Sequence, residues 1–160
     1  MKKSLLIGLG AVALGGLWYA FRPELLFVNQ KTNESFPAVA AASAPTMELT
    51  GRFRGIAHES TGVATIHKLA DGKRVLRLTE FKTSNGPALH LYLVAANDAP
   101  DNDTVKKASF LDLGDLKGNE GDQNYDVPTD VDLAKYRAVT VWCRRFGVNF
   151  GTAPLANKKG

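Results

Sequence analysis

Short apolar runs separated by turn residues recur from residue 47 to residue 157 of this 160-residue chain. Within runs such as 74–81 and 88–96, the side chains alternate with a period of two, which is the spacing of a β-strand. Asp71-Gly72 stands between two runs, and this dipeptide is typical of a tight β-hairpin. Because these residues show almost no helical spacing, we predict an all-β domain. We expect an antiparallel β-sandwich of about eight strands, with a closed barrel as the alternative.

The segments between the runs carry turn chemistry. Residues 97–107 are polar, with Pro100 and three aspartates, and predict a long exposed loop. Residues 114–124 are rich in glycine and also predict turns. The runs that we expect to form strands are 51–58, 62–69, 74–81, 88–96, 109–113, 138–143 and 146–150.

Residues 138–143 form the run that we expect at the centre of a sheet. Alternation divides it into one face with Val139, Val141 and Cys143 and a second face with Ala138, Thr140 and Trp142. Both faces are largely apolar, which is typical of a strand inside a packed sheet. The only cysteine of the chain is therefore predicted at the end of a core strand.

The amino terminus has the pattern of a membrane anchor. Lys2 and Lys3 precede an uncharged run over residues 4–21, which is long enough for a spanning helix of roughly 17 to 25 residues. Trp18 and Tyr19 stand where an anchor places its interfacial aromatics, and small-residue cleavage sites occur only near residues 38–44. We therefore predict an uncleaved signal anchor, or transmembrane helix, over residues 1–23.

The positive flank predicts the orientation of the chain and its domain organisation. Lysines before an apolar run stay in the cytoplasm, so the remainder is expected on the periplasmic or extracellular side. Residues 24–46 show no sustained period and contain Ala, Ser, Pro and Asn, which predicts a flexible spacer. Residues 47–157 are the predicted β-sandwich domain.

The charge balance argues against a nucleic-acid partner. The chain carries a formal net charge of +4, but from Gly51 onward 16 Lys and Arg stand against 13 Asp and Glu. The basic residues are scattered and lack the clustered stripe that follows a phosphate backbone. We expect the membrane, through the N-terminal helix, and an envelope redox protein as partners, and no nucleic acid.

The metal-binding side chains lack the spacing of a known site. His58, His67, His90 and Cys143 are the main soft ligands, but no histidine or methionine follows Cys143, as a blue-copper loop would require. No Cys-x-x-Cys or His-x-x-x-His pair predicts zinc, and no local signature predicts a cysteine nucleophile. We therefore predict no metal site from spacing and no stand-alone enzyme. A site assembled across strands from His58, His90 and Cys143 remains open.

A single cysteine in an exported chain cannot form an internal disulfide. At the end of a core strand, Cys143 can be a small buried hydrophobe, which is chemically inert. Arg144 and Arg145 follow it, and positive neighbours stabilise a reactive thiolate if the sulfur is partly exposed. Both interpretations stay open from the sequence.

An ordered set of residues carries a family resemblance over essentially the whole region 51–155. The set comprises Gly51, Phe53, His58, Gly62, Leu76-Arg77-Leu78, Phe81-Lys82-Thr83, Asn85-Gly86-Pro87, Leu89-His90, Tyr92-Leu93, Leu113-Gly114, Leu116-Lys117-Gly118-Asn119, Gly121, Gln123-Asn124-Tyr125, Val127-Pro128, Val141-Trp142-Cys143, Phe146, Val148, Phe150-Gly151, Ala153 and Leu155. In this order the residues resemble the DM-thirteen domain family. That family occurs in Skeletor-type animal matrix proteins, often beside DOMON domains, and in bacterial envelope proteins.

The resemblance implies an electron-transfer role through the family's characteristic cysteine, which here is Cys143. On this basis Cys143 is the redox candidate, and His90, His58, Trp142 and Tyr92 are candidates for binding a cofactor, with haem or copper both possible. The alternative is a ligand-binding or adhesion module in which the cysteine is structural.

One position departs from the family pattern. Ala88 stands where the family commonly has an acidic or polar residue. If that side chain serves a ligand, this chain has lost it.

Overall fold

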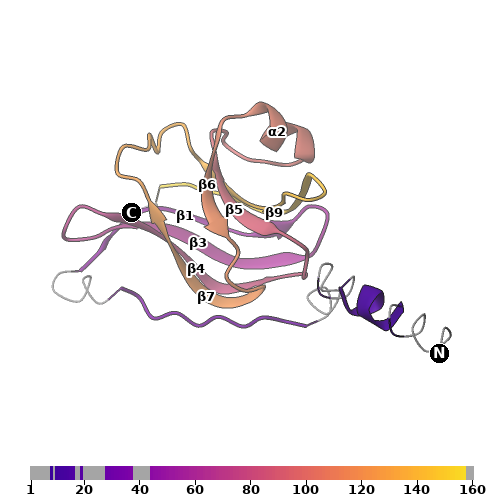
Figure 1. Cartoon of the computed structure of the whole chain (residues 1–160). Helices are drawn as coiled ribbons and strands as arrows, with labels where there is room; N and C mark the ends of the chain where they lie inside the picture. The colour runs from indigo at the N-terminus through magenta and orange to yellow at the C-terminus, as the bar shows by residue number, and fades with distance from the viewer. Residues whose placement is uncertain (1–7, 9, 17–18, 20–27, 38–43, 158–160) are drawn as a thin grey trace.

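In the computed structural model, the residues described are 8, 10–16, 19, 28–37 and 44–157. They form nine strands in two antiparallel sheets (Figure 1). The first sheet has the order β1 (Thr46–Arg52), β3 (Ser60–Lys68), β4 (Arg74–Thr83) and β7 (Glu120–Val127). The second has the order β2 (Arg54–Gly55), β9 (Val148–Pro154), β8 (Ala138–Cys143), β5 (Leu89–Val94) and β6 (Phe110–Asp115).

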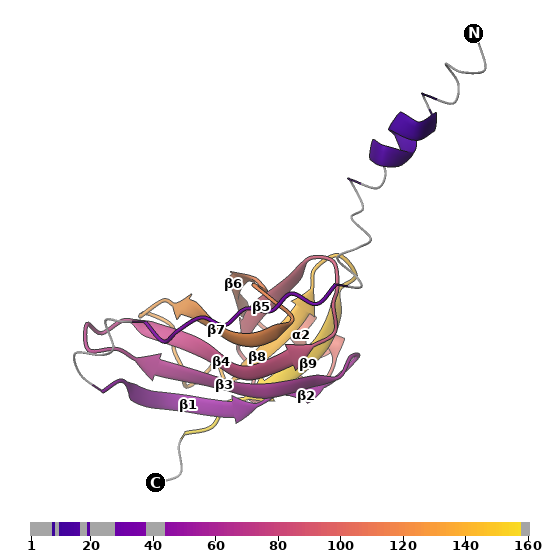
Figure 2. The same cartoon turned by 90° about the horizontal axis from the view of Figure 1, so that it is seen from below.

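The main core lies between the two sheets, as a sandwich requires. Ile66, Leu76 and Leu78 from the first sheet and Leu91 and Val141 from the second belong to one buried cluster. Inward and outward side chains alternate along these strands because successive residues of a strand point to opposite faces. The predicted β-sandwich is therefore confirmed, and Figure 2 shows the two sheets stacked.

The run at residues 138–143 occupies the predicted position. It forms β8, the middle strand of the second sheet, and all six of its residues are buried. The predicted hairpin at Asp71-Gly72 also forms between β3 and β4. There the Lys73 N–H donates to the Asp71 carboxylate at 3.0 Å, and Gly72 has a φ of 85°.

Three segments differ from the sequence predictions. Residues 51–58, predicted as one strand, are divided between the end of β1 and β2 in the other sheet, because the chain passes between the sheets at Phe53, which is buried in the core. Residues 97–107 contain helix α2 (Asn102–Lys107) rather than only a loop, because Asp101 caps the helix and Val105 is buried beneath it. Residues 120–127 form β7, although the glycines predicted turns. Gly121 has a φ of 98°, and the pairing of β7 with β4 is irregular next to it. The strand accommodates the glycine through this irregularity.

The N-terminal region is described only in part. Residues 10–16 are helical, and the anchor predicted over residues 1–23 lies mostly outside the described residues. Within the described ranges, no helix is both long enough and apolar enough to cross a membrane. Residues 28–37 belong to the predicted spacer, and they lie along β7 with a parallel bridge from Lys31 to Glu120 (Figure 2).

Candidate functional site

The structure separates the five candidate site residues into three places. His90 and Tyr92 on β5 and Trp142 on β8 lie on the outer face of the second sheet, where His90 is directly opposite Trp142. Cys143 follows Trp142 in the strand and therefore points to the inner face. His58 lies in the loop between β2 and β3.

Three aromatic rings form a row across the outer face. Tyr92 stacks on Phe110 with ring centroids 4.4 Å apart, and the Trp142 centroid lies 6.3 Å from that of Tyr92. Tyr92 and Trp142 are buried, whereas Phe110 is 45% exposed. Burial, followed by the nearby Asp112 carboxylate, raises the pKa of Tyr92, so its hydroxyl stays protonated at neutral pH. The row thus runs from a covered indole to the surface.

His90 is held between two carboxylates beside this row. Its Nδ1 lies 3.1 Å from Asp112 Oδ1, and its Nε2 lies 2.9 Å from Asp115 Oδ1. Asp112 is itself fixed by the Gly114 N–H at 2.9 Å and faces the Arg144 guanidinium at 3.7 Å. Asp115 is different, because its side chain is 86% exposed.

The two nitrogens of His90 are therefore not equivalent. Asp112 orients the imidazole through Nδ1, which is the arrangement that commonly supports a ligand-binding histidine. Nε2 contacts Asp115, an exposed surface carboxylate, whose hydrogen bond water can replace at little cost. Nε2 is thus the atom of this cluster that can exchange Asp115 for a ligand.

Cys143 is a core residue on the other side of the sheet. Its relative exposure is 0%, and its thiol donates a hydrogen bond to the Pro87 carbonyl, with a Sγ to O distance of 3.1 Å. The sulfur is therefore enclosed and its S–H is engaged with a carbonyl, which opposes attack on or by the sulfur from the solvent. Arg144 does not assist the sulfur, because its guanidinium points to the outer face and pairs with Asp112.

Among the described residues, His58 and His67 lie away from His90 and contact other side chains. His58 is exposed and lies over Phe150, with ring centroids 3.9 Å apart. His67 lies on β3 of the first sheet and meets the edge of Phe36. The site considered from His58, His90 and Cys143 therefore does not assemble in the described part of the chain.

A blue-copper centre does not fit this arrangement. Such a centre needs a cysteine and two histidines around one ion, but His90 and Cys143 point to opposite faces of one sheet. Among residues 8, 10–16, 19, 28–37 and 44–157, no three His, Cys, Asp or Glu side chains are placed to hold a metal ion. Haem iron brings four porphyrin nitrogens of its own, so one protein imidazole is enough to hold it. In number of ligands, His90 Nε2 meets that requirement.

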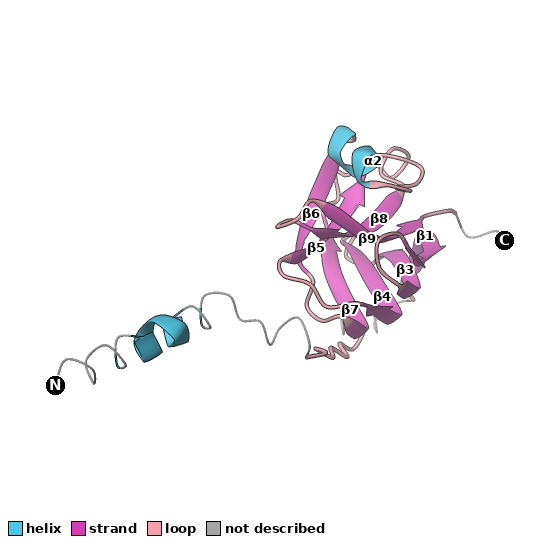
Figure 3. Ribbon diagram, turned by 90° about the vertical axis from the view of Figure 1, so that its right-hand side faces the viewer, coloured by secondary structure: helices cyan, strands magenta, loops and turns pink. Residues whose placement is uncertain are grey.

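Helix α2 covers part of the outer face and is fixed there by a buried amide. Asn149 on β9 accepts from Thr140 Oγ1 at 2.6 Å and donates to the Ala99 carbonyl at 2.9 Å. Its backbone N–H donates to Asn102 Oδ1 at 2.7 Å, at the start of α2. Val105 of α2 belongs to the same small apolar cluster as Tyr92 and Trp142, and Figure 3 shows α2 beside the second sheet.

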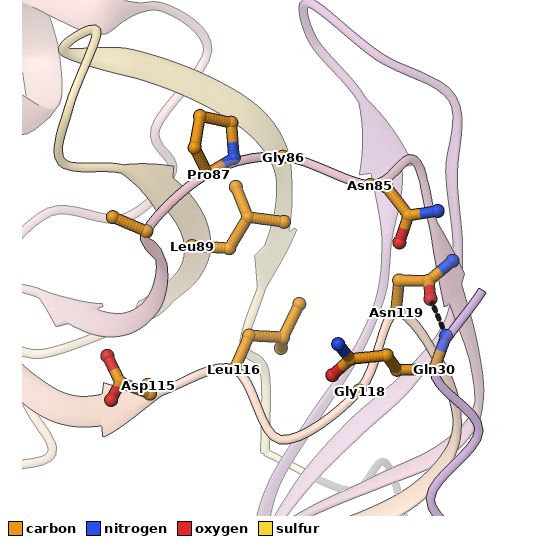
Figure 4. Close-up of a pocket in the computed structure, with 10 residues that line it drawn as sticks. Gln30, Asn85, Gly86, Pro87, Leu89, Asp115, Leu116, Gly118 and Asn119 are labelled. Atoms are coloured by element: carbon orange, nitrogen blue, oxygen red, sulfur yellow. Dashed lines mark hydrogen bonds between the residues drawn. The ribbon is translucent and has the colours of Figure 1, made fainter. Parts of the chain in front are cut away.

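A cavity of about 370 Å³ opens between the 84–89 and 115–119 segments (Figure 4). Its lining includes Pro87, Leu89, Leu116, Asp115 and the Gln30 amide. Two of these residues contact candidate site residues, because Pro87 accepts from Cys143 and Asp115 contacts His90. The cavity therefore lies at one end of the second sheet, next to residues that contact its inner and its outer face.

The sequence did not identify Phe110, Asp112, Asp115 or Asn149. The carboxylates lie in a segment with many acids, and only the register of β6 against β5 selects the two that meet His90. The sequence signal for this site was the alternation along β5, which places His90 and Tyr92 on one face of the strand.

Comparison with known proteins gives a family match. The family model described as "Electron transfer DM13" matches residues 52–155. No curated protein and no solved structure matches the chain. The family match spans nearly the whole sandwich, from the end of β1 to beyond β9, and includes His90, Trp142 and Cys143. The chain therefore belongs to the Electron transfer DM13 family.

Proposed function

We propose that this protein is a membrane-anchored electron-transfer domain whose redox group is bound at His90. The observation that carries the proposal is the unequal setting of the two His90 nitrogens, with Nδ1 oriented by Asp112 and Nε2 facing the exposed Asp115. The redox group is a metal centre ligated by imidazole, and haem is the form that needs one protein ligand only. When bound, it would supply a one-electron couple.

The residues around His90 would assist this group in different ways. Tyr92 and Trp142 are buried and keep water from one side of the imidazole. Arg144 is 56% exposed and offers a positive charge at the surface for an anionic group of the ligand. The exposed Phe110 ring extends the row towards a partner protein, which we expect to be a redox protein of the cell envelope.

The proposed topology follows from the amino terminus. Lys2 and Lys3 before the uncharged run at residues 4–21 support an anchor with the sandwich on the periplasmic or extracellular side. Protease added to intact cells, or to cells with a permeabilised outer layer, should digest the sandwich while the protein stays in the membrane fraction after carbonate washing. Release by carbonate would contradict the anchor.

Ligand titration tests the role of His90. Purified full-length protein is mixed with haem in one arm and with Cu²⁺ in the other, and thermal unfolding and the absorption spectrum are recorded. A ligand that binds the folded state at about 100 times its Kd should stabilise it by about 2.7 kcal/mol. His90→Gln should abolish this gain, and the matched His58→Gln should keep it. Equal binding by His90→Gln, or no binding by the parent, would contradict the proposal.

A second candidate keeps Cys143 as the redox atom. This candidate is favoured because Trp142 and Cys143 are consecutive residues of β8, so the indole and the thiol are separated by one peptide bond. Thiol labelling of the folded protein across pH tests it. Slow labelling at every pH at which the sandwich stays folded would count against this candidate.

A further inference from the structure

Residues 28–37, here called the strap, lie along the exposed edge of β7. The Thr32 N–H donates to the Glu120 carbonyl at 2.9 Å, and the Glu120 N–H donates to the Gln30 carbonyl at 3.2 Å. The Glu34 N–H donates to the Asp122 carbonyl at 2.9 Å. These bonds are those of a parallel strand added to a sheet edge. The strap lies outside residues 52–155, which the family model matches.

Glu34 fixes the strap by its side chain as well as by its backbone. Lys117 Nζ contacts both Glu34 carboxylate oxygens, at 2.8 and 3.0 Å, and the Asn124 N–H donates to the same carboxylate at 2.7 Å. Burial raises the pKa of Glu34, but these hydrogen bonds outweigh it and hold the pKa below its usual value. The charged form is therefore the one that binds.

Phe36 fixes the other end of the strap. Its ring and the His67 ring form a T-shaped pair with centroids 5.0 Å apart, and the Arg77 guanidinium lies 5.7 Å from the Phe36 ring centroid. Leu69 and Val75 complete an apolar patch beneath it. Glu34 and Phe36 are two residues apart, so an extended backbone presents both to the same side.

The strap packs closely against two glycines of the domain, Gly118 and Gly121. A Cβ at Gly118 would lie 2.6 Å from the Gln30 carbonyl oxygen and 2.7 Å from Thr32 Oγ1, and a Cβ at Gly121 would also meet the Thr32 carbonyl. The three atoms nearest to a Cβ at Gly118 all belong to the strap. The lack of a side chain at Gly118 thus serves the approach of another backbone.

We propose that the β7 edge is a recognition site for an extended peptide in which a glutamate is followed two residues later by an aromatic residue, and that the strap is its resident occupant. The strap is held by backbone bonds, by side-chain hydrogen bonds such as that from the Gln30 N–H to Asn119, and by a partly exposed ion pair. The strap belongs to neither sheet's strand order, so its departure leaves every strand of both sheets paired. A partner protein that presents the same pattern can then add its strand to the edge. The tethered strap competes with that partner at an effective concentration of the order of millimolar.

A peptide-binding experiment tests the proposal on the full-length protein in detergent. The probe is a fluorescein-labelled peptide of residues 28–37, and its anisotropy reports binding. In the double variant Glu34→Ala/Phe36→Ala the resident strap loses both anchors while the site keeps all its residues. We expect this variant to bind the probe at least about tenfold more tightly than the parent, in which the strap occupies the edge.

Two controls make the result specific. Adding Gly118→Ala to the double variant should reduce probe binding at least about tenfold, because the new Cβ meets the peptide backbone. A probe carrying the Glu34→Gln and Phe36→Ala changes should bind at least about tenfold more weakly than the natural one to the double variant. Circular dichroism and thermal unfolding of each variant confirm that the sandwich is intact.

Two results would overturn the proposal. Equal probe affinity of parent and double variant would show that the strap does not occupy the site. Undiminished binding by a folded Gly118→Ala triple variant would place the peptide elsewhere. Neither result depends on His90, so the proposal stands or falls separately from the electron-transfer role.

Discussion

Ala88 has a left-handed backbone, with a φ of 57°. Asparagine, aspartate and glycine tolerate this conformation better than alanine, because an ordinary Cβ crowds the neighbouring carbonyl. A polar residue such as asparagine or aspartate at this position therefore has a backbone explanation. Its replacement by Ala88 need not remove a ligand contact, since the alanine side chain is exposed at the rim of the cavity.

Ala88→Gly should stabilise the protein. Relief of the left-handed strain is worth about 1 to 2 kcal/mol, and the greater freedom of the unfolded chain offsets about 0.4 to 1 kcal/mol of it. We expect a net gain of about 0.5 to 1 kcal/mol in urea unfolding. The matched Ala57→Gly, at an exposed residue without positive φ, should lose stability instead. A loss at both positions would contradict the strain at Ala88.

Cys143→Ser should destabilise the fold without abolishing electron transfer. The hydroxyl is more polar than the thiol in a site of 0% exposure, although the Pro87 carbonyl remains as an acceptor. We expect a cost of about 1 to 2 kcal/mol in the free energy of unfolding. Unfolding identical to that of the parent would show that the sulfur is not packed in the core.

His67 should make the fold sensitive to acid. Burial lowers its pKa, with a smaller contribution from Arg77, and its Nδ1 is buried without a hydrogen-bond partner. The unfolded chain therefore binds a proton more readily, so stability is full above the unfolded pKa near 6.5 and falls as pH drops below it. We expect a loss of less than about 1 kcal/mol between pH 7.5 and 5, because the ring is only partly buried.

Chemical denaturation at both pH values checks this expectation. His67→Phe should remove this part of the pH dependence and keep the edge contact with Phe36. A loss of stability between the two pH values that is the same in His67→Phe and in the parent would assign the acid sensitivity to other groups.

At the level of elements, alternation and turn chemistry located most strands. Residues 138–143 and the Asp71-Gly72 hairpin lie where their patterns predicted, since both patterns are local. Helix α2 was missed because its six residues are too few for a helical period, and its cap and buried Val105 act through tertiary contacts. β7 was missed because Gly121 lies beside a bulge in the pairing with β4 and allows the approach of the strap, which no local pattern encodes.

Asn149→Ala should loosen α2 from the second sheet. The change removes the amide that joins Thr140 to the Ala99 carbonyl and leaves that carbonyl buried without this partner. We expect a cost of about 2 to 3 kcal/mol. Hydrogen exchange should then speed up in α2 and β9 more than in β3 and β4. The exposed Asn97→Ala is the control, and unchanged exchange in α2 would contradict the role of Asn149.

For the whole molecule, the sequence predicted the sandwich and the family but only part of the site. Alternation predicts that His90 and Tyr92 share one face of their strand, and that Trp142 and Cys143 point to opposite faces of theirs. The meeting of His90 with Trp142, and its separation from Cys143, depend on the β5–β8 register. The pairing of His90 with Asp112 and Asp115 depends on the β5–β6 register, which a single sequence does not specify.

The measurement that tests the central claim most directly is a redox titration of the haem-loaded full-length protein followed by absorption. The claim is that the electron resides on a group at His90 and not on the Cys143 thiol. Cys143→Ser should therefore retain a one-electron transition close to that of the parent, whereas His90→Gln should lose it. A transition that disappears in folded Cys143→Ser and persists in His90→Gln would contradict the claim.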